Sequence, residues 1–323
     1  MTVVLVGPTA AGKSSLAIQL ALRYAAAGSP AEIVNADSML LYRGMDIGTA
    51  KPSLVERRGV PHHLVDILAV TQTATVAEFQ RLARGAIADS RSRGIVPIVV
   101  GGSALYVRAI VDDFQFPGTD PTVRAALEAE LERIGSEEMH ARLARLDPTA
   151  AAMIEPANGR RIVRALEVGQ LTGGSYRANL PTHDYVLPDV IQIGLDIDRA
   201  ELDLRIAARV NDMWQKGFVD EVRKLVDVGL RQGKTASRGL GYRQVLDFLA
   251  GGMTEAEAQQ QTVLATRRFA RRQDSWFRKD PRIHWLRHDD PALVDAAYRL
   301  AVAVGSGRRN SFTSPAVNRI MED

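Results

Sequence analysis

The sequence predicts an α/β protein in which a parallel sheet carries an inserted, all-helical domain. Three observations support this. Short runs of β-branched and aliphatic residues alternate with helical patterns, as in parallel sheets whose strands are buried on both faces. The first such run leads directly into a glycine-rich loop and a helix. The middle of the chain is rich in Ala, Leu, Arg and Glu and shows helix starts without a strand pattern.

The strands of the sheet follow from the apolar runs. We expect them at residues 2–6, 32–35, 63–68, 95–100 and 190–195. Apolar residues at helical spacing predict a helix over residues 14–24, and a second helix is expected over 76–92. Helices are expected to dominate after Asp198.

The boundaries of the insert follow from helix-start signals. Asp120-Pro121 and Asp147-Pro148 each combine an N-cap residue with proline at the first helical position. We therefore expect a discontinuous core at 1–114 and 190–304 and a helical domain at 115–189, with residues 173–183 as its flexible exit. Residues 305–323 are polar, rich in Gly and Ser and aperiodic, which predicts a flexible tail.

Composition narrows the class of protein. The 323 residues are 46% hydrophobic, which is enough for a large core. The chain has no cysteine, which excludes disulfides, thiolate zinc sites and a cysteine nucleophile. We see neither a signal-peptide pattern nor an apolar run that could cross a bilayer, so we expect a cytoplasmic protein without a membrane partner. The net charge is only +3, but residues 261–288 carry eight Lys/Arg against two acids.

The strongest chemical signal is a phosphate-binding loop. It has the pattern G-x-x-x-x-G-K-[ST] between a buried strand and a helix, the context that makes this motif credible. Loop N–H groups and the helix N-terminus would face an anion, the lysine would add positive charge, and the last hydroxyl would reach Mg²⁺. The residues of this predicted diphosphate site are Gly7, Pro8, Thr9, Ala10, Ala11, Gly12, Lys13 and Ser14.

This loop does not identify the phosphate. ATP-driven motors usually place an aspartate at the end of a second strand, whereas residues 95–100 run into Gly101-Gly102 without an acid. A small-metabolite kinase and another diphosphate-using enzyme both remain open. A non-catalytic RNA-binding protein is the third alternative.

Asp37 is the first candidate base. It follows a strand, so it is expected at the carboxyl edge of the sheet, where ligands bind in open α/β folds. There it could hold Mg²⁺ or accept a proton from a nucleophile. An aspartate that caps a turn is an equally good interpretation.

Two C-terminal segments suggest a nucleic-acid partner. Residues 237–243 interleave glycines with Arg238, Tyr242 and Arg243, which suits phosphate contacts and base stacking. Further on, Arg267, Arg268, Arg271, Arg272 and Gln273 recur at helical spacing and predict a cationic face for a phosphate backbone. A solvated helix face is the alternative. The six histidines lack metal-ligand spacing, and we interpret them as structural.

Taken in order, several motifs resemble those of the tRNA dimethylallyltransferases, in their bacterial form, over nearly the whole chain to about Leu286. They are GPTAAGKS, NADSMLLYRGMDIGTAKP, PHHLVDI, VVGGSALY, RRIVRALEV, GFVDEV, SRGLGYRQV and ATRRFARRQDSWFRK. The resemblance implies a P-loop NTPase-like core with an inserted helical domain that grips the anticodon stem-loop of tRNA. It also implies dimethylallyl diphosphate as donor, the N6 amine of adenine 37 as acceptor, and Mg²⁺ as cofactor. We expect a monomer.

The resemblance also implies roles for individual residues. Asp37 matches the general base, and Thr9, Lys13 and Arg209 match residues around the diphosphate, with Ser14 at Mg²⁺. The adenine would flip into a channel with one mouth for tRNA and one for the donor. The positions that match tRNA contacts are Asp37, Ser38, Met39, Leu40, Ser103, Arg124, Arg160, Arg161, Ile162, Val163, Arg164, Arg238, Gly239, Leu240, Gly241, Tyr242 and Arg243. Arg271 joins them from the cationic face.

Overall fold

The computed structural model describes residues 1–114, 116, 118–176 and 184–305, and the chain forms two compact units. One unit comprises Met1–Val107 and the chain from Leu187 onward, and the other comprises Arg108–Val186. The first division falls inside helix α3 (Ala104–Val111), a few residues before the boundary expected at 115. The tail and most of the exit segment expected from the sequence lie outside the described residues.

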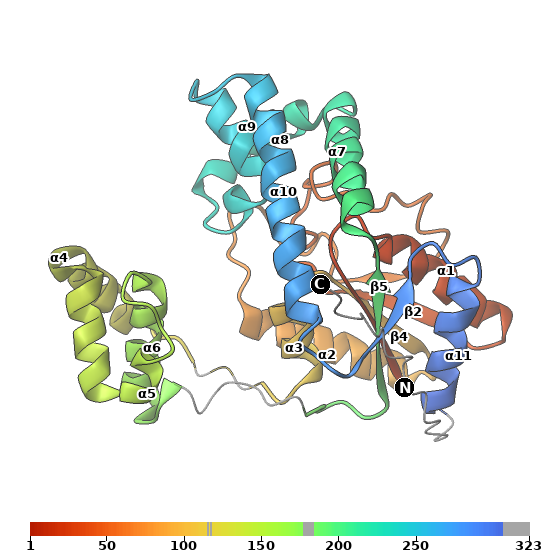
Figure 1. Cartoon of the computed structure of the whole chain (residues 1–323), viewed down its shortest axis with the longest axis horizontal. Helices are drawn as coiled ribbons and strands as arrows, with labels where there is room; N and C mark the ends of the chain where they lie inside the picture. Colours follow the sequence, from red (N-terminus) through yellow and green to blue (C-terminus); the bar gives the residue numbers. More distant parts are fainter. Residues whose placement is uncertain (115, 117, 177–183, 306–323) are drawn as a thin grey trace, which may run out of the picture. The chain divides into compact units, whose positions relative to one another are not determined.

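The first unit is built on a parallel sheet of six strands (Figure 1). The order is β3-β2-β4-β1-β5-β6, so β1 lies in the interior between β4 and β5. All five residues of β1 are buried, which explains its uninterrupted aliphatic sequence. The strands are β1 (Thr2–Val6), β2 (Ala31–Asn35), β3 (His62–His63), β4 (Val96–Val100), β5 (Val190–Asp196) and β6 (Ile283–Arg287).

The sheet corrects two predictions. The strand expected over 63–68 is wrong beyond His63, because Leu64 and Asp66 have positive φ angles of 60° and 59°, which end an extended strand. Strand β6 was missed. It is an edge strand in which only Ile283 is buried, so it lacks the apolar run by which the interior strands were predicted.

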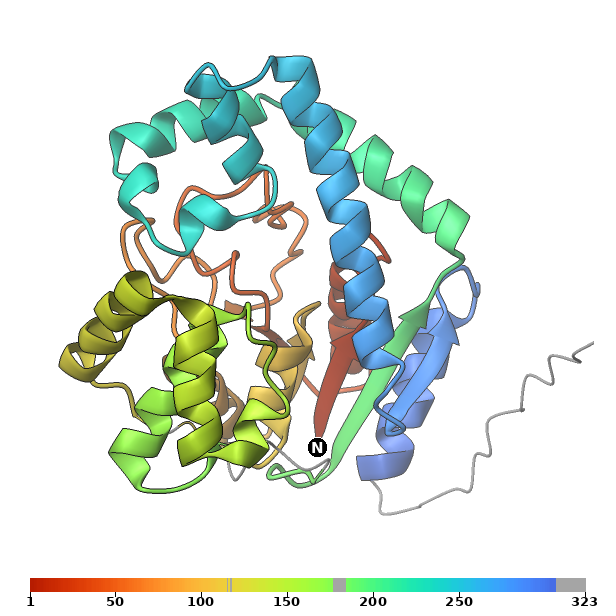
Figure 2. The ribbon, with the colours of Figure 1, turned by 60° about the vertical axis from the view of Figure 1, so that its left-hand side comes forward.

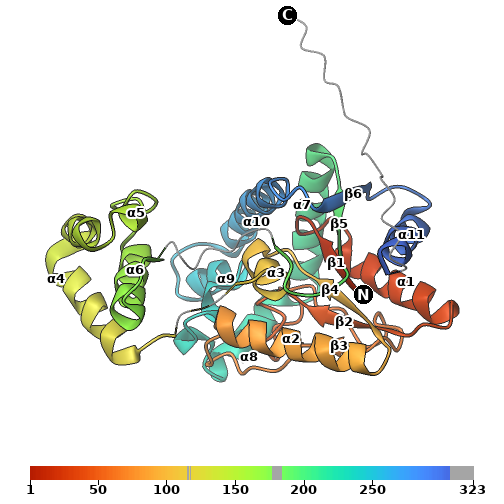
Figure 3. The same cartoon turned by 90° about the horizontal axis from the view of Figure 1, so that it is seen from below.

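One face of the sheet is covered by α1 (Lys13–Ala26) and α11 (Leu293–Gly305), which lie side by side in Figure 3. Val3 and Leu5 of β1 point to this face and share a core with both helices. Helix α2 (Val76–Ser92) packs against β2 and β4. Since the chain moves outward from β1 to β2 through α1 and returns to β4 through α2, right-handed crossovers place these helices on opposite faces.

The C-terminal helices of this unit form a second layer of packing. Helix α10 (Glu255–Phe277) packs along α7 (Arg199–Gln215) and against α9 (Tyr242–Leu249), as Figure 2 shows. Helix α8 (Phe218–Asp227) joins α9 in a hydrophobic core of its own, which also takes in Tyr42 and Met45 from the loop after β2. This core therefore ties an N-terminal loop to the C-terminal helices.

The second unit is a small helical bundle of α4 (Pro121–Leu146), α5 (Pro148–Ala151) and α6 (Gly159–Thr172). The predicted starts of α4 and α5 are confirmed. Asp120 Oδ1 accepts hydrogen bonds from the amides of Thr122 and Val123, and Asp147 Oδ1 accepts one from Ala150. The fold class predicted from the sequence is confirmed. Within the described part of the chain, no helix is long and apolar enough to span a membrane.

Candidate active site

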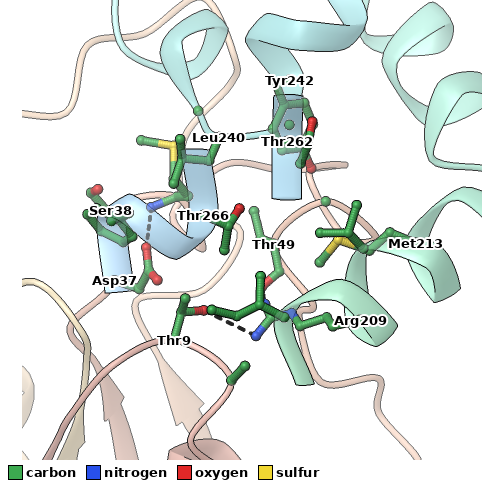
Figure 4. A pocket seen from close by; sticks show the side chains of 18 of the residues that line it. Thr9, Asp37, Ser38, Thr49, Arg209, Met213, Leu240, Tyr242, Thr262 and Thr266 are labelled. Atoms are coloured by element: carbon green, nitrogen blue, oxygen red, sulfur yellow. Dashed lines mark hydrogen bonds between the residues drawn. The ribbon is translucent and has the colours of Figure 1, made fainter. Parts of the chain in front are cut away.

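The site lies where β1, β2 and β4 end. Two adjoining cavities of about 280 Å³ and about 290 Å³ open there. In Figure 4, Asp37, Thr9 and Arg209 approach the first cavity from three separate segments of the chain. The residues that line both cavities are Thr9, Ala10, Asp37, Thr49, Arg209, Phe269 and Gln273.

The phosphate-binding loop has the backbone its sequence requires. Gly7, Ala10 and Gly12 adopt positive φ angles of 136°, 66° and 100°. A Cβ at Gly7 would also lie 3.3 Å from the Leu195 carbonyl oxygen, so glycine serves both geometry and packing there. Gly12 is the N-cap of α1, and having no side chain it leaves the first amides of that helix open to a ligand. The loop is therefore shaped for an anion.

Lys13 lies in this loop and lines the second cavity with Ser14. Its ammonium donates to the Pro8 carbonyl at 2.6 Å. Burial, together with the nearby Arg209 guanidinium, lowers the pKa of Lys13 to about 7, although Asp37 acts in the opposite direction. An anion bound between Lys13 and Arg209 would raise the pKa of Lys13 again, because it would offset the repulsion between the two cations.

Arg209 reaches the same space from α7. It donates from Nη1 to Thr9 Oγ1 at 3.3 Å and from Nη2 to the Thr49 carbonyl at 3.2 Å. Burial lowers the pKa of Arg209, and Asp37 partly offsets this. Ile206, Val210 and Met213, which follow one another on α7 at intervals of four and three residues, line the first cavity and make one side of it apolar.

Asp37 caps a turn and also faces the cavities. Its Oδ1 accepts a hydrogen bond from the Met39 amide at 2.9 Å, so the carboxylate does cap a turn (Figure 4). The same side chain lines both cavities. Asn35 fixes the backbone of Asp37. Its Oδ1 accepts from the Asp37 amide, and its Nδ2 donates to the carbonyls of Asp37 and Leu64. Ser38 and Met39 line the first cavity and Leu40 the second.

Gln273 corrects the cationic face predicted for α10. It is buried, its Oε1 accepts from the Thr9 amide at 2.8 Å, and its Nε2 donates to the Gly102 carbonyl at 2.8 Å. It therefore bridges the phosphate-binding loop and the glycine turn after β4. Helical spacing placed Gln273 on the same face as the arginines. Spacing gives only the direction of a side chain around the helix axis, and it does not show which segment packs against that face.

Three of the four arginines predicted on this face lie on the surface, whereas Arg267 is half-buried and donates to the Asp203 carbonyl. Arg268, Arg271 and Arg272 are exposed, and Arg271 approaches Asp203 at 3.6 Å. The guanidinium of Arg272 lies 5.8 Å from the centre of the Phe269 ring. This arrangement is compatible with the phosphate-backbone interpretation and with a solvated face.

A loop that the sequence left uninterpreted, residues 42–52, forms a wall of the site. Lys51 is almost fully buried and pairs with Asp46 and Asp66. On the other side the Glu221 carboxylate, from α8, accepts hydrogen bonds from backbone amides of the loop. Neither Glu221 nor Thr49 was singled out from the sequence, since their role appears only when distant segments meet.

Residues 238–242 border the first cavity, and Arg243 follows them on α9. Arg238 and Arg243 are exposed, in keeping with phosphate contacts. Tyr242 is not available as a stacking surface, because its ring is 1% exposed and packs edge-on against Phe218 with centroids 5.0 Å apart. It forms a wall instead.

The matched positions of the helical unit differ in exposure. Arg160 and Arg161 are exposed, whereas the side chains of Ile162 and Val163 lie in the hydrophobic core. Two more arginines, Arg124 and Arg164, both donate to the fully buried carboxylate of Glu167. Ser103 belongs to the first unit and lines the first cavity.

Two of the described histidines lie beside glutamates. His63 Nε2 lies 2.8 Å from Glu32 Oε2, and His288 Nε2 lies 3.0 Å from Glu201 Oε2. Over the described residues, no three His, Cys, Asp or Glu side chains cluster closely enough to hold a metal.

Comparison with known proteins places this site in a family. A family model described as IPP transferase matches residues 40–280. The chain belongs to this family. A tRNA dimethylallyltransferase of Thermobifida fusca is 63% identical over 298 residues, covering 92% of this chain and 93% of the relative.

Solved structures agree with this assignment. A tRNA isopentenylpyrophosphate transferase of Bacillus halodurans matches with a TM-score of 0.69 at 36% identity, over 95% of this chain and 97% of that one. A eukaryotic dimethylallyltransferase acting on tRNA matches with a TM-score of 0.79 at 25% identity, over 95% and 78%. The resemblance inferred from the motifs is confirmed, and the kinase and non-catalytic alternatives lose their support.

Proposed function

We propose that this enzyme transfers a dimethylallyl group from dimethylallyl diphosphate to the N6 amine of adenine 37, beside the anticodon of tRNA. One observation carries the proposal beyond family membership. An anion cradle with Lys13 and Arg209, and a carboxylate, Asp37, face one continuous pair of cavities. Such a space accommodates a diphosphate donor and a nucleophile that must lose a proton.

The chemistry assigns a part to each group. The N6 nitrogen forms a bond to C1 of the dimethylallyl group while the bond from C1 to the bridging oxygen breaks and diphosphate leaves. Lys13, Arg209 and the loop amides stabilise the negative charge that develops on the leaving group. The Thr9 hydroxyl accepts from Arg209, which leaves its own proton free to donate to the bridging oxygen. Asp37 Oδ2 accepts the N6 proton, since Oδ1 is already engaged by Met39.

The protein offers few ligands for Mg²⁺ here, so the ion fits this site only when diphosphate is bound as well. Ser14 lines the second cavity beside Lys13 and supplies one hydroxyl ligand. Mg²⁺ commonly binds through few protein ligands, with phosphate oxygens and water completing the octahedron. When bound it would neutralise diphosphate charge. We propose Ser14 as its protein ligand.

The tRNA contacts are proposed on the same basis. Arg238 borders the first cavity, Arg243 is exposed at the start of α9, and further exposed arginines occur on α10 and on α6 of the helical unit. Arginine suits phosphate oxygens because its guanidinium donates in a planar fork. We place the reaction in the cytoplasm, which fits a chain without cysteine.

The test is direct. The purified protein is incubated with Mg²⁺, unmodified tRNA and dimethylallyl diphosphate, and the nucleosides of the digested tRNA are weighed. An adenosine heavier by one isopentenyl group supports the proposal. Phosphorylation of a metabolite by ATP, with unchanged tRNA, would overturn it.

The role of Asp37 needs its own variant. Asp37→Asn keeps the size of the side chain and its acceptor for the Met39 amide, but removes the basic oxygen. We expect turnover to fall by about 10²–10⁴-fold, the usual contribution of a general base, with tRNA affinity largely retained. Loss of tRNA binding instead would assign Asp37 to recognition.

A further inference from the structure

Glu221 lies on α8, outside the groups assigned to the chemistry, yet it organises a wall of the site. Its Oε2 accepts hydrogen bonds from the amides of Asp46 at 3.0 Å and Ile47 at 2.6 Å. Its Oε1 lies 3.3 Å from the amide of Gly48. One carboxylate thus holds three consecutive amides, the arrangement by which loops bind anions.

The same carboxylate also reaches a neighbouring segment of the site. Tyr242 donates its hydroxyl to Glu221 Oε1 at 2.6 Å. Tyr242 begins α9 and lines the first cavity, as Gly48 does. Glu221 therefore fixes the separation between the loop after β2 and the start of α9.

The loop held by Glu221 continues into the reacting centre. Thr49 follows directly after the three bound amides, and its carbonyl accepts from Arg209 Nη2. Arg209 Nη1 in turn donates to Thr9 Oγ1. Movement of the loop away from α8 would withdraw one of the two acceptors that orient the guanidinium.

The loop at Gly48 is tightly packed against two aromatic rings. A Cβ on Gly48 would lie 2.2 Å from the Phe218 ring and 2.7 Å from the Tyr242 ring, so the backbone is in close contact with both aromatic rings. The amides of Ile47 and Gly48 are partly buried at this contact, so they need an acceptor there, because amides withdrawn from water without one are costly. Glu221 supplies that acceptor.

We propose that Glu221 is a positioning residue for prenyl transfer: through the loop at 46–49 it orients Arg209 toward the departing diphosphate. This inference rests on the proposed function. A purely structural tether would make the protein less stable without a specific link to Arg209. The two roles therefore differ in one measurable way: in the positioning role, the loss of activity on substituting Glu221 depends on whether Arg209 is present, and in the structural role it does not.

The experiment is a double-mutant cycle of Glu221→Gln and Arg209→Lys, read as kcat for dimethylallyl transfer at saturating tRNA. Gln keeps the size of the side chain but replaces one acceptor oxygen with a donor that opposes the amides. Displacement of a catalytic group by about 1 Å can cost on the order of 100-fold, so we expect Glu221→Gln to lower kcat by about 10- to 100-fold. In the Arg209→Lys background the same change should cost less than about threefold.

Asp220→Asn is the matched control, because Asp220 is the neighbouring acid on α8 and pairs only with the exposed Arg223 in the described contacts. We expect it to keep wild-type kcat. An equal loss from Glu221→Gln in both backgrounds would overturn the inference, as would unchanged kcat in Glu221→Gln. If Glu221→Gln does not fold, Glu221→Asp, which is one methylene shorter and cannot reach both the loop amides and the Tyr242 hydroxyl, enters the cycle in its place.

A second readout separates this inference from the proposed function. The affinity of each variant for inorganic diphosphate is measured by calorimetry, which needs no transfer activity. Weaker binding in Glu221→Gln, with no further loss when Arg209 is already Lys, supports the positioning role even if the donor proves not to be dimethylallyl diphosphate. Equal affinities for wild type and Glu221→Gln would count against it.

Discussion

The bridge made by Gln273 gives the sharpest stability prediction. Gln273→Leu keeps nearly the same volume but removes both hydrogen bonds, to the Thr9 amide and the Gly102 carbonyl. The Gly102 carbonyl is left buried without this partner, which costs about 1–3 kcal/mol. The Thr9 amide borders a cavity that water can enter, so its loss costs about 1 kcal/mol.

Together we expect a fall of about 2–4 kcal/mol in the free energy of unfolding, measured by urea denaturation. Each kcal/mol corresponds to about 2–4 °C in Tm for a unit of this size. Gln260→Leu on the same helix is the control, since Gln260 is exposed and should tolerate the change.

Inorganic diphosphate should also bind more weakly to Gln273→Leu, because the Thr9 end of the cradle loses its anchor. Equal stability of the two variants would show that Gln273 does not hold the loops together. Lower stability with unchanged diphosphate affinity would show that the bridge is structural only.

Three further predictions follow from charged groups. The pKa of Lys13 is lowered to about 7 in the absence of a ligand, so diphosphate binding at pH 8 should be accompanied by uptake of a proton. Calorimetry in two buffers of different ionisation heat detects this proton uptake, and Lys13→Met should abolish it. Glu167→Ala should lower the free energy of unfolding by about 2–3 kcal/mol in urea, since it strands two arginines that are only partly exposed; an unchanged midpoint would contradict this. Hydrogen bonds from Arg93 lower the pKa of Glu32 to about 2 against the opposing effect of burial. Its stabilisation is therefore present above pH 4.5 and lost as the pH falls towards 2, so Glu32→Gln should flatten the acid limb of a Tm titration, and an unaltered limb would refute the assignment.

The parts of the site that could be predicted are those whose causes are local in sequence. The phosphate-binding loop has its strand, its glycines and its lysine within residues 2–14, so pattern and conformation coincide. Asp37 could be placed because the carboxyl ends of parallel strands share one edge of a sheet. Strand β6 could not, because an exposed edge strand needs few apolar residues.

The groups that hold the site together could not be predicted, because each acts across a long stretch of chain. Gln273 contacts Thr9 across 264 positions, and Glu221 contacts Ile47 across 174. Both are polar residues on amphipathic helices, where the sequence favours a solvated face. Only packing against the loops of the N-terminal half turns these faces inward.

A division of labour follows from this arrangement. The N-terminal half supplies three of the groups proposed to act on the substrates, Thr9, Lys13 and Asp37, near the ends of strands. The C-terminal helices supply Arg209 directly and hold those loops through Gln273 and Glu221. Loops alone would sample many conformations, whereas side chains fixed on helices limit them. Substitutions on α8 and α10 that never touch a substrate should therefore lower kcat, and their effects should converge on Arg209 and Thr9 rather than spread evenly over the fold.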